Sequence, residues 1–449
     1  MQTDERPVAV HCSDSDPGSD PGPGSDRDPD RDLAAWLALL EKRSSEAHID
    51  LGLARVRQVW KGMQTALSAP VITVAGTNGK GSTVAMLEAM LTAAGHRPLV
   101  YTSPHLVSFS ERIRIGGRPA AEHAIAAAFD QVERARGSVT LTYFEHITLA
   151  ALAMASAHDV NAVVLEVGLG GRLDAVNIID PDVAVITSIG IDHVEFLGDD
   201  RRSIALEKAG IARSERPVIV GETQPPDGLL AHLEGVGARI TLLNDVYEQD
   251  SSGFVLKDVS GAARLAFAPP ALPGAWQCRN AALAVLALRA LRDRLPVSAE
   301  TMARGLAQVQ LAGRFQQLAK NPDVIVDVAH NPAAARALAG ALGPHSGRST
   351  AVFSALHDKD VAGIGRALVQ CFSDWLVAPL ATGRGQSAAA IINELQAAGV
   401  SARMMAVESV GAALEQALAD SGPEDRIVVF GSFLTAAEAL NQWPSRRIR

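Results

Sequence analysis

A glycine-rich stretch with one lysine and two hydroxyl residues, Gly76–Thr83 (GTNGKGST), carries the strongest chemical signal in the chain. It follows an apolar, β-branched run and precedes a helical pattern, so backbone N–H groups and the helix start could face one anion. Lys80 would add a point charge for the β- and γ-phosphates of a nucleotide. Val74 and Gly81 break the strict P-loop pattern, which leaves a plain strand–helix turn as the alternative. We expect nucleotide contacts from Thr77, Asn78, Gly79, Lys80, Gly81 and Ser82.

The elements that must position this loop alternate short apolar runs with longer helical patterns from Leu33 onward. The apolar runs are rich in β-branched residues, as buried parallel strands are, and lie at 71–75, 98–101, 161–167 and 182–188. Helical spacing is found between them at 83–94 and 146–158. This alternation predicts an α/β fold with a P-loop-type, doubly wound, mostly parallel sheet.

The pattern changes within residues 215–270, where short strand-like pieces and turns suggest an antiparallel insertion or an extension of the sheet. A helix near 277–292 closes this part, and a second series of strand and helix patterns begins near residue 312. Its strand-like runs lie at 323–328, 350–355, 374–378, 402–406 and 426–430. We expect a disordered acidic leader over 1–32, an ATP-binding central domain over 33–310 and a smaller, Rossmann-like C-terminal domain over 311–449.

Composition narrows the class of protein. The 449 residues carry a net charge of −9, so little positive charge is available to steer a nucleic acid. The three cysteines have neither disulfide nor metal-ligand spacing, which indicates a reducing compartment. No apolar run is long enough to span a membrane, and Asp4 and Glu5 argue against a signal peptide. We expect a cytoplasmic protein with neither nucleic-acid nor membrane partners.

Eight short segments, taken in their order along the chain, resemble the folylpolyglutamate synthase family of the Mur ligase superfamily, and its bifunctional bacterial members most closely. They are Gly76–Ser82 (GTNGKGS), Thr102–Leu106 (TSPHL), Glu166–Asn177 (EVGLGGRLDAVN), Asp192-His193, Glu207–Ile211 (EKAGI), Asp327–Pro332 (DVAHNP), His357–Asp360 (HDKD) and Gly431–Thr435 (GSFLT). The resemblance extends over about residues 33–445. It implies a monomeric, ATP-dependent ligase that joins L-glutamate to 7,8-dihydropteroate and adds γ-linked glutamates to tetrahydrofolate through an acyl phosphate. The C-terminal domain would then be a glutamate ligase domain.

Three polar residues at the ends of predicted strands suit the metal chemistry of such a ligase: Ser103, Glu166 and His193. The resemblance implies that they hold Mg²⁺ near the γ-phosphate. Alternatives are a turn residue for Ser103 and a satisfied loop histidine for His193, whereas burying Glu166 in an apolar strand without a partner would be costly.

The resemblance also implies that Lys208, in EKAGI, is carbamylated and helps to hold a second metal ion. Arginine cannot replace lysine there, because only a neutral amine takes up CO₂. The alternative is a surface lysine paired with Glu207 or Glu222. Lys80, His193 and Lys208 are thus the expected catalytic residues.

Further ATP contacts are implied at Asn280, Arg314 and Asp327. An arginine carried by the second domain could reach the transferring phosphate only when the domains close. The alternatives are a helix cap for Asn280 and a surface ion pair for Arg314. This chain departs from the family pattern at Trp276, where histidine is common, and at Ala312, where proline is usual.

Contacts to the pterin substrate are implied in two regions. The first is the segment after Leu33, which would contribute Ser44 and Ser45. This segment departs from the family pattern around Glu41–Ser45. The second region supplies Thr142, Tyr143, Phe144 and Leu173, and the adjacent aromatic rings could form a stacking wall. An aromatic plug in the core at a helix start is the alternative.

Two other functions compete with folate ligation. One is a Mur-type ligase for a UDP-muramoyl precursor, which the TSPHL segment and the lack of a recognisable uridine-binding domain before residue 71 disfavour. The other is a nucleotide-dependent switch without ligase chemistry, which would leave Glu166, His193 and Lys208 unexplained.

Overall fold

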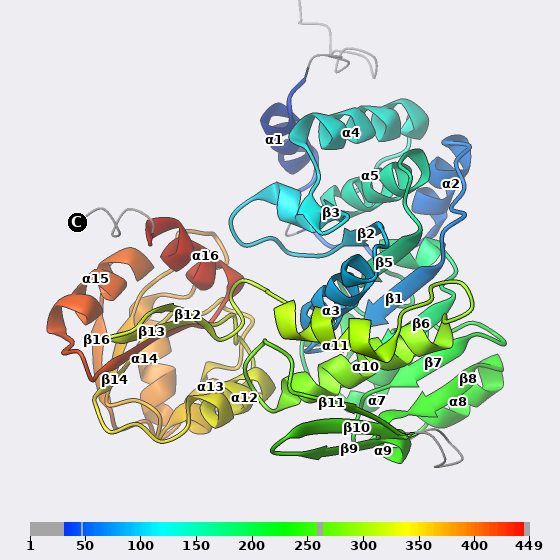
Figure 1. Ribbon diagram of the computed structural model, residues 1–449. Coiled ribbons are helices and arrows are strands. Elements are labelled where there is room, and N and C mark those ends of the chain that lie inside the picture. The colour runs from blue at the N-terminus through cyan, green and yellow to red at the C-terminus, as the bar shows by residue number, and fades with distance from the viewer. Residues whose placement is uncertain (1–30, 46–47, 258–263, 444–449) are drawn as a thin grey trace, which may run out of the picture.

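The computed structural model describes residues 31–45, 48–257 and 264–443, and its strands form three sheets (Figure 1). The largest has eight strands in the order β4 (Arg118–Pro119), β3 (Ile113–Ile115), β2 (Pro98–Tyr101), β5 (Ala162–Glu166), β1 (Val71–Ala75), β6 (Val183–Ile186), β7 (Pro217–Val220) and β8 (Arg239–Leu242). The six strands β2, β5, β1, β6, β7 and β8 run parallel to one another, and β3 and β4 add an antiparallel edge beside β2.

Helices cover both faces of this sheet, as the doubly wound prediction requires. On one face pack α1 (Leu33–Arg43), α2 (Ala54–Gly62), α4 (Glu122–Arg136), α5 (Tyr143–Ala157), α7 (Arg201–Ala209) and α8 (Leu229–Val236). On the other face pack α3 (Lys80–Ala93), α10 (Trp276–Ala290) and α11 (Ala299–Gln308). The shorter elements are α6 (Val194–Leu197), α9 (Leu243–Val246), and the 3₁₀ turns η1 (Phe109–Arg112) and η2 (Ala175–Ile178).

Residues 215–270 combine the two expected alternatives. Their first strands, β7 and β8, extend the parallel sheet. The next three form a small antiparallel sheet against α10: β9 (Tyr247–Asp250), β10 (Gly253–Lys257) and β11 (Arg264–Phe267).

The C-terminal part forms its own six-stranded sheet. Its order is β12 (Gln316–Ala319), β13 (Asp323–Val326), β17 (Arg426–Phe430), β14 (Ser349–Phe353), β15 (Asp374–Val377) and β16 (Arg403–Ala406), and only β12 is antiparallel. One face carries α12 (Pro332–Leu342), α13 (Val361–Leu368) and α14 (Ala388–Ala397), and the other carries α15 (Val410–Asp420) and α16 (Phe433–Gln442). The predicted α/β class with a smaller second α/β domain is therefore confirmed.

Helix starts depart from the predicted ranges for a local reason. The helix expected from 146 begins at Tyr143, because the Thr142 hydroxyl accepts the Glu145 N–H and the Glu145 carboxylate accepts the Thr142 N–H. The helix expected from 83 begins at Lys80, directly after Gly79, whose φ of 90° lies in the left-handed region. The leader assigned to 1–32 lies almost wholly outside the described residues. No helix in the described ranges is both long and apolar enough to cross a membrane.

A buried ion cluster joins α1 to α4. Glu133 accepts hydrogen bonds from Arg43 at 2.8 Å and from Arg136 at 2.5 Å. Burial alone would raise the pKa of Glu133, but the two guanidinium groups outweigh it and lower the pKa from 4.5 to about 2. Its ionisation therefore stabilises the fold fully above pH 4.5, and this stabilisation is lost as the pH falls towards 2.

We expect Glu133→Gln to lower the free energy of unfolding by about 2 kcal/mol at pH 7. The difference from wild type should shrink between pH 4.5 and 2, because the wild-type carboxyl then becomes protonated too. Urea unfolding at several pH values measures this. The control is Asp130→Asn on the same helix, which removes a solvent-exposed pair with Arg134 and should cost less than about 0.5 kcal/mol. Equal losses for Glu133→Gln at pH 3 and pH 7 would contradict the assignment.

Candidate active site between the two domains

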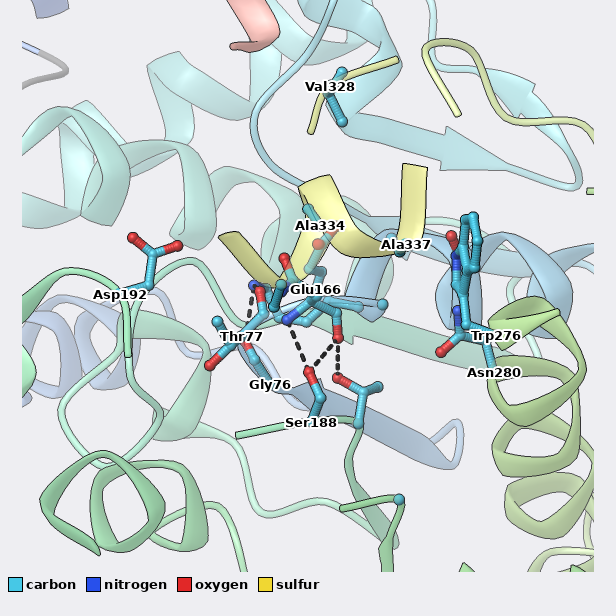
Figure 2. Close-up of a pocket in the computed structure, with 18 of the residues that line it drawn as sticks. Gly76, Thr77, Glu166, Ser188, Asp192, Trp276, Asn280, Val328, Ala334 and Ala337 are labelled. Atoms are coloured by element: carbon cyan, nitrogen blue, oxygen red, sulfur yellow. Dashed lines mark hydrogen bonds between the residues drawn. The ribbon is translucent and has the colours of Figure 1, made fainter. Parts of the chain in front are cut away.

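A cavity of about 410 Å³ lies between the carboxyl edge of the large sheet and the C-terminal domain. Figure 2 shows the glycine-rich loop at its floor, Asp192 at one side, Trp276 and Asn280 at the other, and α12 above. All the residues predicted to contact ATP or metal line it: Thr77, Asn78, Gly79, Lys80, Gly81, Ser82, Ser103, Glu166, His193, Lys208, Asn280, Arg314 and Asp327.

The glycine-rich loop is held by the segment that follows β6. The Thr77 N–H donates to the carbonyl of Ser188 at 2.8 Å, and the Asn78 N–H donates to its hydroxyl at 3.0 Å. Gly76 passes so close to Thr187 that a Cβ would lie 1.8 Å from its hydroxyl oxygen, so a side chain is excluded. The hydrogen bonds from the segment after β6 to the loop, some of them drawn in Figure 2, hold the loop in a defined conformation.

Lys80 is folded onto this loop, where its ammonium donates to the carbonyls of Gly76 at 2.9 Å and Thr77 at 3.3 Å. Burial lowers the pKa of Lys80, and the Glu166 carboxylate opposes that shift. Ser82 also lines the cavity, and its hydroxyl accepts a bond from Gln277.

Glu166 brings a buried carboxylate into the cavity at the end of β5. It is 6% exposed, and burial raises its pKa against the opposing charges of Lys80 and Arg314. The backbone N–H of Ser103 supplies a hydrogen bond, and no side chain in the described ranges donates one. A Cβ on Gly81 would lie 3.7 Å from both Glu166 Oε1 and Arg314 Nη2, so the two charged groups meet beside the loop.

Arg314 reaches this point from the C-terminal domain. Its guanidinium lies 5.2 Å from the ring centre of Phe433 and faces Asp327 as well as Glu166. Asp327 in turn accepts bonds from the N–H groups of Phe315 and Ala329, at 2.7 and 2.8 Å. The surface ion pair weighed for Arg314 is therefore wrong, because the arginine points into the interdomain cavity.

Asn280 lies inside α10 rather than at its cap, which is at Ala275, so the capping alternative is also wrong. Its side chain is buried against the glycine-rich loop, where a Cβ on Gly79 would lie 2.6 Å from Asn280 Oδ1. The amide donates to Gln277 at 2.9 Å.

Lys208 is 3% exposed, and its side chain makes no hydrogen bond or ion pair within the described ranges. The alternative of a surface lysine is wrong, since its suggested partners bind arginines instead, Glu207 to Arg172 and Glu222 to Arg201. Burial, aided by Lys80, lowers the pKa of Lys208 to about 7. Much of this amine is consequently neutral near pH 7.

His193 begins α6 in a left-handed backbone conformation, with φ of 52°. Desolvation lowers its pKa to about 4 against the opposing effect of Asp192, which leaves the imidazole neutral at pH 7. Within the described ranges no three His, Cys, Asp or Glu residues gather as a ready-made metal cluster. Any metal site here must therefore use a mixed set of ligands.

The interdomain contacts around Asp192 were missed by sequence reasoning. Asp192 accepts bonds from Lys359 at 3.0 Å and Asn331 at 3.1 Å, and lies 3.7 Å from the ring of His330. Asn331 also exchanges two amide bonds with Asn78 of the glycine-rich loop, at 3.1 and 3.2 Å. The segments Asp192-His193, DVAHNP and HDKD were visible in the sequence, but nothing local shows that they meet.

The residues predicted to contact the pterin lie outside the cavity lining. Tyr143 is buried in the core, and Phe144 packs against Gly168, which does line the cavity. Thr142 caps α5 and Leu173 is half-buried in the loop after β5. Ser44 is the C-terminal cap of α1, and the next residue, Ser45, is exposed.

Two family models match the chain: "Mur ligase middle domain" over residues 74–223 and "Mur ligase, glutamate ligase domain" over residues 313–433. The first contains the glycine-rich loop and Glu166, and the second carries Arg314 and Asp327. Fold and site thus define an ATP-dependent ligase of the Mur ligase type.

Comparisons of the whole chain with known proteins show to which family of Mur-type ligases it belongs. The dihydrofolate synthase/folylpolyglutamate synthase of Escherichia coli K12 is 44% identical over 92% of this chain and 96% of the relative. The E. coli FolC structure in complex with DHPP and ADP superposes with a TM-score of 0.86 at 43% identity, covering 93% and 99% of the two chains. A bifunctional folylpolyglutamate synthase/dihydrofolate synthase with Mn, AMPPNP and L-glutamate bound gives 0.83 at 41% identity, covering 92% and 98%. The chain belongs to the dihydrofolate synthase/folylpolyglutamate synthase family.

Replacing Arg314 by lysine tests the convergence of charges from the two domains. We expect kcat to fall about a hundredfold and the affinity for nucleotide to change only a few-fold. The planar guanidinium of Arg314 can lie over the Phe433 ring and still donate two hydrogen bonds to a phosphate, whereas the ammonium of lysine cannot do both. Steady-state phosphate release and ADP titration measure the two effects. Arg348→Lys, in a surface pair with Asp374, is the matched control and should have wild-type kinetics. A wild-type kcat in Arg314→Lys would contradict the expectation that the guanidinium acts on the transferring phosphoryl group.

Proposed function

We propose that this chain joins L-glutamate to 7,8-dihydropteroate and adds γ-linked glutamates to tetrahydrofolate, at the expense of ATP. The observation that carries this proposal is the cavity in which a phosphate loop, a buried carboxylate and an arginine from the second domain converge. The relatives bear both activities in their names, and their structures hold DHPP, ADP, AMPPNP and L-glutamate. We place the boundary between the two catalytic domains near residue 310 and propose that the enzyme acts as a monomer.

In the proposed reaction a folate carboxylate attacks the γ-phosphate, ADP leaves, and an acyl phosphate forms. The glutamate amine then attacks the acyl carbon and releases phosphate, with loss of a proton to solvent. The glycine-rich loop would hold the phosphates through its N–H groups and Lys80. Arg314 would stabilise the charge on the transferring phosphoryl group, and it reaches this position only when the domains are closed.

A divalent metal fits the described residues. Glu166 presents a buried carboxylate without a side-chain donor, and such a group is stabilised by a cation. Ser103 and neutral His193 line the same cavity and supply the oxygen and nitrogen donors that complete a mixed set. A metal held there would neutralise charge on the phosphates during transfer.

Lys208 is proposed to be carbamylated. Its neutral amine would form a bond from Nζ to the carbon of CO₂ and release one proton, which converts a buried neutral amine into a carbamate anion with a carboxylate group. The burial of Lys208, its lowered pKa and the absence of any partner in the described ranges support this modification. The new carboxylate would assist in holding a second metal ion.

We expect Lys208→Ala and Lys208→Met to reduce turnover to below about 1% of wild type, because neither side chain can carry the carbamate. The fold should persist, since no ion pair is lost, and far-UV circular dichroism checks this. Wild-type protein in ¹³C-bicarbonate should show a carbamate ¹³C resonance that Lys208→Met lacks. Lys61→Met, at the exposed end of α2, should retain both activity and resonance. Near-normal turnover in Lys208→Met would remove the carbamate from the mechanism.

For the pterin, we propose that Phe144, Tyr143, Thr142 and Leu173 form the wall beside Gly168, with Ser44 and Ser45 contributing from the N-terminal segment. Phe144 supports this placement, because its ring contacts the loop that leads from Glu166 into the cavity. The ring of Phe144 is supported by the buried ring of Tyr101, and the two ring centres lie 6.1 Å apart.

The decisive assay is glutamate-dependent release of phosphate from ATP, with dihydropteroate and tetrahydrofolate supplied in separate reactions. Turnover with both substrates is expected. Turnover with one alone would restrict the enzyme to that reaction. Turnover only with a UDP-muramoyl acceptor would replace the folate assignment, and nucleotide binding without any glutamate-dependent turnover would favour a switch.

A further inference from the structure

A second cavity, of about 210 Å³, lies behind two of the residues proposed to hold metal. Ser103 and Glu166 line both this cavity and the active-site cavity, so they form part of the wall between the two. Among the polar residues that line only the second cavity are Glu88, Thr102 and Arg114. Any effect that these three side chains have on Ser103 and Glu166 is therefore exerted from outside the active-site cavity.

Arg114 reaches this place through the alternation of side chains along β3. It pairs with Val100 of β2, whereas its neighbour Ile113 packs in the core on the opposite face of the sheet. Arg114 consequently lies on the face that α3 covers, where its guanidinium forms an ion pair with Glu88 of that helix at 2.8 Å. The two side chains are only 16% and 11% exposed, so the pair is largely screened from water.

The guanidinium of Arg114 joins three segments of the chain. Nε donates to the Glu88 carboxylate at 2.8 Å, and Nη1 donates to the Thr102 hydroxyl at 3.2 Å and to the Glu111 carbonyl at 2.8 Å. Thr102 begins the loop that carries Ser103, and Glu111 lies near the end of that loop. Arg114 thus ties the base of the loop to α3, the helix that begins in the glycine-rich loop.

The rest of this loop is held by the side chain of Glu111. Its carboxylate accepts the backbone N–H groups of three consecutive residues, Leu106, Val107 and Ser108, at 2.8, 2.9 and 2.7 Å. Because the loop is braced within itself, its placement against Glu166 is set at its base. There the N–H of Ser103 donates to the Glu166 carboxylate, which connects the anchor to the proposed metal ligands.

Stability alone does not account for this ion pair. Removing both charged groups from water offsets most of their attraction, so apolar side chains of similar volume would stabilise the fold as well or better. Burial raises the pKa of Glu88 even though Arg114 opposes the shift. What apolar side chains could not supply is a planar fork of donors that bonds to three segments at fixed angles.

We propose that Arg114 is a positioning residue for the metal site, which sets the place of Ser103 relative to Glu166 and the glycine-rich loop without contacting metal or substrate. The inference rests on the proposed role of Ser103 and Glu166 as metal ligands. Removing an outer group that orients metal ligands weakens metal binding by about ten- to a hundredfold. Lysine at position 114 would keep the positive charge but could not bond to all three segments.

The test measures Mn²⁺ binding to the full chain, with protein in excess over AMPPNP, from the electron paramagnetic resonance signal of the free ion. Arg114→Lys and Arg114→Met should each bind Mn²⁺ about tenfold more weakly than wild type, because both remove the anchor at the base of the loop. Thr102→Val, which removes one acceptor, should lose about threefold. Affinity for AMPPNP in EDTA should change by less than about twofold in all three variants, since the glycine-rich loop is untouched.

Two further variants separate positioning from a general loss of stability. Arg136→Gln breaks the buried pair with Glu133 and should lower stability in urea, yet it should bind Mn²⁺ as wild type does. Glu166→Gln removes a proposed ligand and should weaken Mn²⁺ binding at least as much as Arg114→Met.

Wild-type Mn²⁺ affinity in Arg114→Lys, with weakened binding in Glu166→Gln, would overturn the positioning role and leave the metal site in place. An equal loss in Arg136→Gln would also overturn it, because the effect would then be one of stability. Unchanged binding in Glu166→Gln would overturn the metal site and this inference with it. Failure of the ligase reaction is distinguishable from these outcomes, since Mn²⁺ binding that depends on Arg114 would persist without glutamate-dependent turnover.

Discussion

The cost of burying a carboxylate at the end of β5 is the constraint on which the site depends. Glu166 sits in an apolar strand, so its charge must be balanced by groups brought from elsewhere. Lys80 comes from the phosphate loop and Arg314 from the other domain. Neither domain alone contains the full set, so the charged groups converge only in the cavity between the two domains.

The contacts that hold the two domains together are polar and lie at the edge of this charge cluster. Asn331 has its amide oxygen and nitrogen bonded to Asn78, to Asp192 and to the start of α12. Lys359 neutralises Asp192, and contacts to His330 and Lys359 outweigh burial and hold the pKa of Asp192 well below its usual range. Because water can replace each of these hydrogen bonds, they hold the two domains together with only a small net free energy.

Much of the fold was predictable because the signals are local. β-Branched apolar runs, helical periodicity and the glycine-rich turn each reflect the backbone geometry of one element, and their alternation implies a parallel sheet. The starts of helices were less predictable. Helix α5 begins three residues before its apolar pattern does, because the hydrogen bonds between Thr142 and Glu145 cap the helix at Thr142. The sequence left open whether residues 215–270 form an antiparallel insertion or extend the sheet, because short strands carry weak periodic signals.

The sequence by itself determined the glycine-rich loop, the α/β class, the family and the residues expected to contact ATP or metal, because these depend on local pattern and on motifs in a particular order. Only the tertiary structure decided that the Lys208 side chain is buried with no partner among the described residues, that Asp192 meets Lys359, and that Trp276 packs on Gly274. Burial and pairing between residues far apart in the chain are properties of packing, and no local spacing encodes them.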